Sequence, residues 1–207
     1  MVMDSGRLLR ALFLVLVLIS VSLNPVAAQS AVRIDEIIQL TDQTVYLNAL
    51  DSDDSNVLAI GDKGVVLLIP PEQPSGTETL VPITDENLLA VDFHPAGNAL
   101  IVGESGKIIR YDYQDRRLSN VSGTGSVELS TLTAVSWNTN GAWAYIASDA
   151  GLIWRFRSLV EGNEMVPIEN TRASSVQAID CHSIIRMCVV VTESDGIALI
   201  DADHQIS

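Results

Sequence analysis

Short apolar runs separated by polar turn residues recur along the chain from about residue 33 to its end. The runs are rich in Val, Ile and Leu, and clusters of Gly, Asp, Asn and Ser separate them. Apolar runs of this length that are bounded by turn residues are typical of buried strands in antiparallel sheets. The pattern therefore predicts an all-β protein.

The apolar runs recur in units of three, and a short turn joins the second run of each unit to the third. Every such turn ends in a glycine, at Gly64, Gly106, Gly151 and Gly196, and in the first three an acidic residue stands two positions earlier, at Asp62, Glu104 and Asp149. We expect the glycine to supply the positive φ of a tight hairpin, and the acidic side chain to accept hydrogen bonds from the amides of its own turn.

A fourth and more polar run precedes each unit, at residues 34–40, 79–83, 127–131 and 165–168. One outer and three inner strands in a repeat of forty-odd residues describe a β-propeller blade. The sequence thus predicts a β-propeller domain over residues 29–207, with four blades of four antiparallel strands at about residues 33–70, 78–113, 126–158 and 164–203.

The number of blades leaves three interpretations open, because propellers typically have four to eight blades. The chain is part of a larger propeller, or it forms a closed ring of four blades, or two chains form an eight-blade ring as a homodimer. In a closed ring, residues 34–40 would pair with residues 197–201 and so cover an open sheet edge.

One repeat resembles a known family. The segment from His94-Pro95 through Ser105-Gly106 to Tyr111-Asp112 resembles a WD-repeat blade, with Tyr111-Asp112 at the place of the Trp-Asp pair of that family. The turns at residues 61–64 and 103–106 also resemble the repeats of the photosystem II assembly factor and of sortilin-type propellers. These resemblances imply propeller architecture over about residues 33–203 and no particular activity.

The N-terminus has the features of a secretory signal peptide. Arg7 and Arg10 precede an apolar run that begins at Ala11, and small residues end the segment at Ala27-Ala28. The apolar run is shorter than the roughly 20 residues that a spanning helix needs. We therefore expect residues 1–28 to be removed before Gln29, and the mature protein to lie outside the cytoplasm without a membrane anchor.

The net charge of the chain narrows the range of partners. Twelve Lys and Arg stand against 26 Asp and Glu, which gives a formal net charge of -14. Binding to nucleic acid requires clustered positive charge, so an acidic chain of this kind is not expected to bind it. A protein partner remains the expected class.

The two cysteines lie seven positions apart, at Cys181 and Cys188, on either side of a turn. Two adjacent strands would bring them face to face, and export is compatible with a disulfide. Two buried free thiols are an equal alternative. A metal site made of Cys181, His182 and Cys188 lacks a fourth ligand and is disfavoured.

No nucleophile elbow, phosphate-binding loop or metalloprotease motif occurs, so the sequence predicts no catalytic residue, no cofactor and no resident metal. Residues 51–56 have the oxygen density of a calcium loop, but they lack its glycine and terminal Glu, and a solvated turn is the expected structure.

Asn120 begins a glycosylation sequon in a loop between blades. Trp143 and Trp154 fall outside the regular aromatic positions and are candidates to reach the surface.

An aspartate recurs at the end of the first strand in three of the four units, at Asp51, Asp92 and Asp180, and Ser136 occupies this position in the remaining unit. Recurrence favours a structural hydrogen bond over catalysis, because a catalytic residue would more naturally be unique.

The sequence thus predicts a secreted, non-catalytic propeller that binds a protein partner through loops at its rim. The alternative is an enzyme or a ligand-binding or glycan-binding propeller that uses Asp92 or Asp180 in a central channel.

Overall fold

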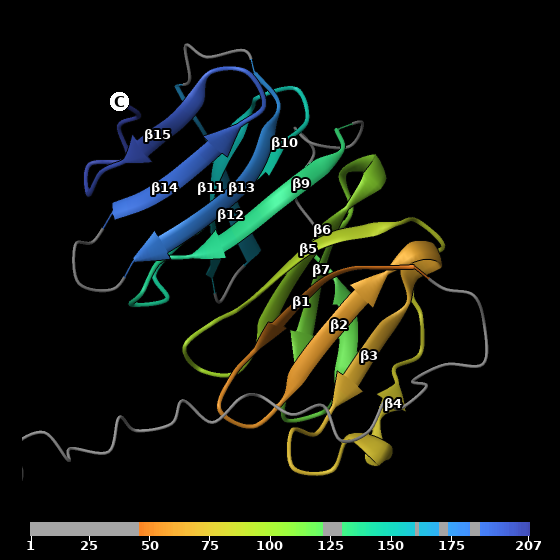
Figure 1. The fold of residues 1–207 in the computed structure, drawn as a ribbon. Helices are drawn as coiled ribbons and strands as arrows, with labels where there is room; N and C mark the ends of the chain where they lie inside the picture. The colour runs from red at the N-terminus through yellow and green to blue at the C-terminus, as the bar shows by residue number, and fades with distance from the viewer. Residues whose placement is uncertain (1–45, 122–129, 160–161, 170–173, 183–186) are drawn as a thin grey trace, which may run out of the picture. The chain divides into compact units, whose positions relative to one another are not determined.

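The computed structural model describes residues 46–121, 130–159, 162–169, 174–182 and 187–207. Four antiparallel sheets follow one another along these residues, and each sheet is one blade (Figure 1). Among the described residues, helix is limited to three short 3-10 turns, at Asp62–Gly64, Pro74–Gly76 and Glu104–Gly106. No helix in this described part of the chain is long and apolar enough to cross a membrane. The predicted all-β propeller with four blades is confirmed.

Each blade is a meander of strands in chain order, and the strands have the following bounds. Blade 1 contains β1 (Leu47–Ser52), β2 (Val57–Gly61), β3 (Val66–Ile69) and β4 (Glu78–Thr79). Blade 2 contains β5 (Leu88–Phe93), β6 (Ala99–Gly103), β7 (Ile108–Asp112) and β8 (Arg117–Asn120). Blade 3 contains β9 (Leu132–Trp137), β10 (Ala144–Ser148), β11 (Ile153–Leu159) and β12 (Gly162–Ile168). Blade 4 contains β13 (Val176–His182), β14 (Met187–Thr192) and β15 (Gly196–Ile200).

The outer strand belongs to the blade before it, whereas the sequence repeat placed it in the blade after it. Glu78–Thr79 pairs with β3, and β12, which includes Met165, pairs with β11. Pairing between strands that follow one another in the chain is the usual solution in antiparallel sheets. The outer strand of blade 2, β8, lies outside the polar runs that the sequence indicated.

The same rule operates at the described end of blade 4. After β15 the chain turns at residues 201–204, and Ile206 forms a bridge with Ile200. Leu199 and Ser207 exchange two backbone hydrogen bonds, each 3.0 Å long. Residues that follow β15 therefore occupy part of its outer edge. The predicted pairing of residues 34–40 with this edge, the signal segment and most of the predicted strand at 127–131 lie outside the described residues.

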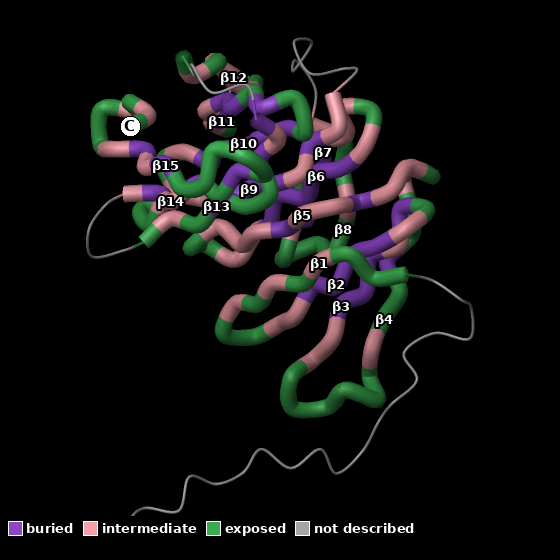
Figure 2. Tube along the Cα trace, turned by 45° about the horizontal axis from the view of Figure 1, so that its top comes forward, coloured by how far each residue is buried: buried purple, intermediate pink, exposed green. Residues whose placement is uncertain are grey.

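The hydrophobic core lies in three layers, one between each pair of successive blades. Figure 2 shows that buried residues concentrate in the second strands of the first three blades, and every residue of β6 and β10 is buried. Because side chains alternate between the two faces of a strand, β6 supplies Ile101 to the layer with blade 1 and Leu100 to the layer with blade 3. A blade in the middle of the series is thus apolar on both faces, which explains the continuous apolar runs in the sequence.

Candidate functional site

The loops that join first to second strands form one rim of the described blades, which we call the loop rim (residues 53–56, 94–98 and 138–143). In the first of these loops the Asp53 carboxylate accepts hydrogen bonds from the amides of Ser55 (2.8 Å) and Asn56 (2.6 Å). This is a self-contained turn, as expected for residues 51–56. Among the described residues, no group of three or more His, Cys, Asp or Glu side chains is arranged to hold a metal ion.

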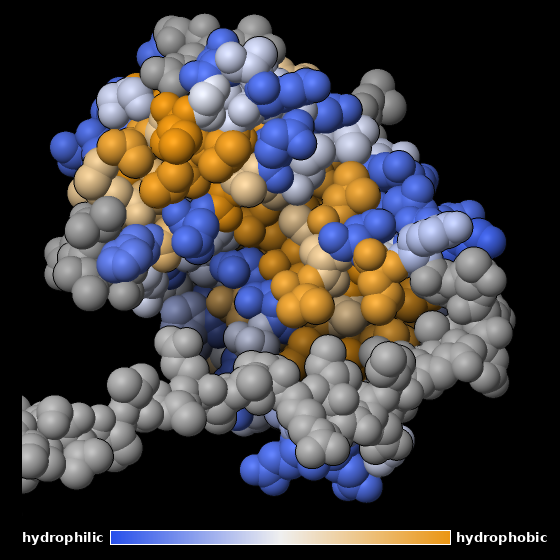
Figure 3. Space-filling model, in the orientation of Figure 1, coloured by the Kyte–Doolittle hydropathy of each residue, from blue (hydrophilic) through white to orange (hydrophobic). Residues whose placement is uncertain are grey.

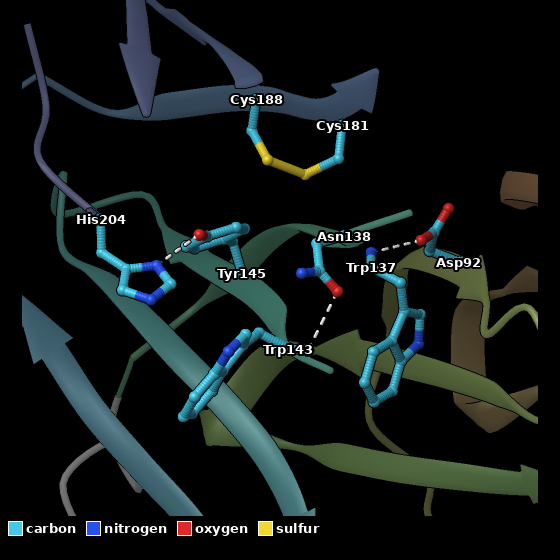
Figure 4. The surroundings of a disulfide bond; sticks show 8 residues. All are labelled: Asp92, Trp137, Asn138, Trp143, Tyr145, Cys181, Cys188 and His204. Atoms are coloured by element: carbon cyan, nitrogen blue, oxygen red, sulfur yellow. Dashed lines mark hydrogen bonds between the residues drawn. A yellow bond between two sulfur atoms is a disulfide. The ribbon is translucent and has the colours of Figure 1, made fainter. Parts of the chain in front are cut away.

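A pocket of about 430 Å³ opens on the loop rim between blades 3 and 4. It is lined by the loop residues Asn138, Thr139 and Asn140, by the aromatic side chains Trp143, Tyr145 and His204, and by residues of blade 4 that include Met187 and both cysteines. Figure 4 shows the three aromatic rings on one side and the disulfide on the other. Trp143 and Tyr145 come from blade 3, whereas His204 comes from the turn after β15, so both blades build the pocket.

Hydrogen bonds and ring contacts hold the aromatic side of this pocket. The Tyr145 hydroxyl and His204 Nδ1 lie 2.7 Å apart in a hydrogen bond, and the rings of Trp143 and His204 meet edge to face with centroids 5.6 Å apart. Burial raises the pKa of the Tyr145 phenol and lowers the pKa of the His204 imidazole. Both shifts favour the neutral forms, so the pair is an uncharged hydrogen bond at neutral pH.

Two arginines lie against Trp143. The guanidinium carbons of Arg155 and Arg157 lie 3.9 and 4.3 Å from the centre of the Trp143 ring. Arg157 also forms a 2.7 Å ion pair with Glu164. Cation–π contacts of this kind fix an aromatic ring in place, and they add positive charge beside a pocket of an otherwise acidic chain. Trp143 is partly exposed, whereas Trp154 is buried, so only the first of the two candidate tryptophans reaches the surface.

Cys181 and Cys188 lie directly opposite one another on β13 and β14 and form a disulfide. With both thiols in this bond, the metal site considered for Cys181, His182 and Cys188 loses two of its three ligands. The disulfide closes the hairpin of blade 4 at the loop rim and forms a rigid wall of the pocket (Figure 4). It therefore ties the described ends of two strands together next to the aromatic cluster.

A second pocket, of about 680 Å³, occupies the equivalent place between blades 1 and 2. Its lining is more acidic and includes Asp53, Asp54 and Glu78, with Tyr113 as its exposed aromatic side chain. Arg116 lies 3.8 Å from Glu78, but both side chains are largely exposed and such a pair contributes little stability. The repeat therefore produces one acidic and one aromatic pocket on the same rim.

Two of the three recurring aspartates connect the first strands of neighbouring blades. The Asp51 carboxylate accepts a 2.8 Å hydrogen bond from the amide of Phe93, and the Asp92 carboxylate accepts one from the amide of Trp137 (Figure 4). Each bond joins a blade to the next, which is the structural role that their recurrence indicated. Burial is the main cause that raises the pKa of Asp92 to about 7, and the nearby carboxylates of Asp51 and Asp180 add to it.

The turn residues that the sequence singled out lie at the opposite ends of the strands, in the hairpins between second and third strands. The four glycines all have positive φ, between 64° and 81°. In the first two hairpins the backbone carbonyls of Asp62 and Glu104 accept from the amides of Val65 and Lys107, whereas the Asp62 carboxylate accepts from Asn48. The backbone amide of Asp149 donates to the backbone carbonyl of Thr131.

Asn120, the candidate glycosylation residue, is exposed at the end of β8, on a strand rather than in a loop.

His94 and Gly141 form a contact between blades 2 and 3 that the sequence did not indicate. His94 Nε2 lies 3.0 Å from the Gly141 carbonyl, its Nδ1 accepts from the amide of Ala96, and its ring meets Trp137 edge to face. The two residues lie 47 positions apart. A histidine next to a proline in a turn gives no local signal for such a contact.

We expect Gly141→Ala to destabilise the protein by about 2 kcal/mol, because Gly141 has φ +70° and an added Cβ would lie 2.2 Å from His94 Nε2. Denaturant unfolding would measure the loss. Adding His94→Ala to Gly141→Ala should recover part of it, since the ring that clashes is then absent. An unchanged unfolding midpoint for Gly141→Ala alone would contradict the described contact.

Comparison with known proteins gives a fold and no sequence relative. No model of a known protein family matches the chain, and no curated protein matches it in sequence. The crystal structure of the RRP9 WD40 repeats is similar with a TM-score of 0.66 at 13% identity, and the structure of U3-55K with a TM-score of 0.65 at 14% identity. Each alignment covers 81% of this chain, against 52% and 53% of the other chains. The chain therefore has a WD40-type propeller fold and spans about half the length of these two structures.

Proposed function

We propose that the chain is a secreted, non-catalytic propeller that binds a protein partner through the loop rim. The observation that carries this proposal is the aromatic pocket between blades 3 and 4, where Trp143, Tyr145 and His204 face the disulfide. Repeat folds bury their strands and leave their loops free to vary, so the rim is the natural binding face of a propeller.

The chemistry of the pocket favours a protein side chain as the group it takes up. Tryptophan, tyrosine and arginine are the residues that most often dominate the energy of protein interfaces. Here Trp143 is held in place by Arg155 and Arg157, so little side-chain freedom is lost when a partner covers it. The side-chain oxygens of Asn138 and Asn140 accept from amides of their own loop, and their NH2 groups at the pocket edge supply donors for a peptide backbone.

Selection from a phage-displayed library of random peptides against the purified protein tests this function. Peptides that bind should compete with one another for the pocket, and Trp143→Ala should weaken them about tenfold or more, as calorimetry would measure. Leu152→Ser is the matched control, since Leu152 is an exposed apolar residue in the hairpin at the other end of blade 3. This pocket would be ruled out as the binding face if Trp143→Ala left the affinity of the selected peptides unchanged. It would also be ruled out if Leu152→Ser weakened their binding as much as Trp143→Ala does.

Secretion is supported by the N-terminal segment and by the disulfide. Disulfides persist in oxidising compartments and are uncommon in the cytosol. In a cell that exports the protein, mass spectrometry of the mature form should find Gln29 at its N-terminus and Cys181 bonded to Cys188. A cytosolic protein that retains Met1 and has free thiols would overturn this part of the proposal.

A second candidate function rests on the inner carboxylates. A carboxyl group with a pKa of about 7 near two further acids, as at Asp92, is the kind of group that acid–base catalysis or ligand binding uses. If this site binds a small ligand or a glycan, Asp92→Asn abolishes binding in a protein that remains folded. If Asp92 only joins blades, the same variant changes stability and leaves rim binding intact.

A further inference from the structure

The pocket between blades 1 and 2 carries an excess of negative charge. Asp53 and Asp54 come from the loop between β1 and β2 and Glu78 comes from β4, whereas Arg116 is the basic residue of the lining. Three carboxylates against one guanidinium leave two negative charges without an opposite charge in the pocket. Figure 3 shows hydrophilic side chains on the connection after β3, which forms one edge of the pocket. Its volume of about 680 Å³ lies in the range of small-ligand cavities.

The Asp53 carboxylate has one oxygen that its own turn does not use. Oδ1 accepts the hydrogen bonds from Ser55 and Asn56, whereas Oδ2 has no hydrogen-bond partner among the described residues. A Cβ built on Gly97 would lie 3.7 Å from this Oδ2 and 3.3 Å from the Tyr113 ring. The absence of a side chain at Gly97 thus keeps space between an acid of blade 1 and an exposed aromatic ring of blade 2. A carboxylate and an aromatic ring around one space both attract a cation.

A buried hydroxyl without a hydrogen-bond partner also belongs to this pocket. Tyr111 lines it and is only 1% exposed, and its hydroxyl has no hydrogen-bond partner among the described residues. Burial raises the pKa of this phenol, and the charged groups that also act on it include Arg116, Asp53 and Glu78. Because these three residues line the pocket, the hydroxyl lies at the pocket end of the side chain. An unpaired buried polar group costs free energy, so one at a pocket wall points to a ligand that pairs with it.

The arrangement of the acids favours an organic cation over a metal ion. No three acidic side chains in the described part of the chain are placed to hold a metal ion together. An ammonium or guanidinium group is larger and donates several N–H bonds, so it can reach acceptors that lie apart. Such a group ends the side chain of a lysine or an arginine, and free amines carry it too.

We propose that the pocket between blades 1 and 2 binds an organic cation through its N–H groups. Asp53 Oδ2 and the Tyr111 hydroxyl accept from the cation, and the Tyr113 ring lies against it. Arg116, whose guanidinium lies 3.8 Å from Glu78, competes with the cation for that acid. This inference uses no residue of the pocket between blades 3 and 4, so it stands or fails separately from the proposed function.

An NMR titration of the purified protein with the methylamide of Nα-acetyl-lysine tests the site. The backbone amide signals of Ser55, Gly97 and Tyr113 should shift to saturation, and the neutral Nε-acetylated form of this probe should bind at least about tenfold more weakly. Butylammonium distinguishes the source of the cation. Butylammonium that binds as tightly as the lysine probe supports a free amine, whereas weaker binding supports a lysine side chain whose backbone also contacts the pocket.

Two substitutions remove the proposed acceptors without removing their other roles. Tyr111→Phe should weaken the lysine probe about fivefold and leave the unfolding midpoint unchanged or raised, because the lost hydroxyl has no partner to leave unpaired. Asp53→Asn keeps an oxygen for the turn amides and should weaken the probe about tenfold. Glu72→Gln is the matched control, because it removes an exposed carboxylate outside the pocket lining and should leave the affinity unchanged.

The competing arginine gives a test of opposite sign. Arg116→Gln should strengthen binding of the lysine probe, whereas Arg117→Gln, which changes the charge equally outside the lining of this pocket, should not. The proposal is overturned if the neutral probe binds as well as the charged one, or if Tyr111→Phe leaves the affinity unchanged. It is also overturned if Glu72→Gln weakens binding as much as Asp53→Asn, because the cation would then be attracted only by the overall charge of the chain.

Discussion

Gly64→Ala is expected to lower the free energy of unfolding by about 3 kcal/mol or more, the largest loss among the single substitutions considered. Gly64 has φ +71°, and a Cβ built on it would lie 2.1 Å from the carbonyl oxygen of Thr84. That oxygen belongs to the backbone that leads into blade 2, so it cannot rotate away as a side chain would. The substitution therefore has to move a connection between blades.

Gly196 supplies the matched control for this prediction. It occupies the same turn position in blade 4 and has φ +81°, yet nothing lies within 4 Å of the Cβ that alanine would add. Gly196→Ala should therefore cost only the strain of a left-handed alanine, about 1 kcal/mol. Denaturant titrations of both variants measure the difference, which isolates the inter-blade contact. Equal losses for the two variants would mean that backbone strain alone sets the effect.

This pair of glycines also shows how far the sequence determines the fold. The repeat of turn glycines and apolar runs was enough to predict strands, hairpins and blades, because each depends on residues close together in the chain. The outer strands were predicted only in part: β12 contains the predicted run at 165–168, but β8 was missed, and the sequence repeat assigned each outer run to the following blade. β4 contains only Glu78 and Thr79, both exposed, and a strand with no buried face leaves no hydrophobic pattern to read.

The aromatic pocket escaped prediction for a different reason. Tyr145 and His204 lie 59 positions apart and meet only because blades 3 and 4 pack together. The sequence gives the composition of each repeat, but it does not give the relative positions of residues at the edges of neighbouring blades. The disulfide was accessible to sequence reasoning because Cys181 and Cys188 lie on one hairpin and are directly opposed in it. Local pairings were thus predictable, and contacts between blades were not.

Asp92→Asn is expected to stabilise the protein at pH 8 and to flatten the dependence of its stability on pH. Burial, with the nearby carboxylates of Asp51 and Asp180, raises the pKa of Asp92 from its ordinary 3.8 to about 7 in the folded state. Between these values the folded protein binds more protons at this site than the unfolded chain does. The stability that Asp92 contributes is therefore fully present below about pH 4 and is lost as pH rises towards 7.

The size of this effect has an upper limit. A pKa shift from 3.8 to about 7 corresponds to about 4 kcal/mol, and relaxation of the site makes about 2 kcal/mol the expected gain for Asp92→Asn at pH 8. The side-chain amide oxygen that this substitution introduces can still accept from the Trp137 amide, so the bond between blades is kept. Asp92→Ala removes that acceptor and should destabilise the protein at acidic pH, where the wild-type carboxyl is protonated.

Unfolding free energies measured from pH 5 to pH 8 test whether Asp92→Asn changes the pH dependence of stability. Asp112→Asn is the control, because it also removes one carboxylate but acts on an exposed turn, where Asp112 accepts from the amides of Gln114 and Asp115. Its stability curve should run parallel to that of the wild type, whereas the curve of Asp92→Asn should rise above the wild type with increasing pH. If the Asp92→Asn curve stays parallel as well, the inner carboxyl is not desolvated in the folded protein. In that case the charge of Asp92 imposes no cost on the contact between blades 2 and 3.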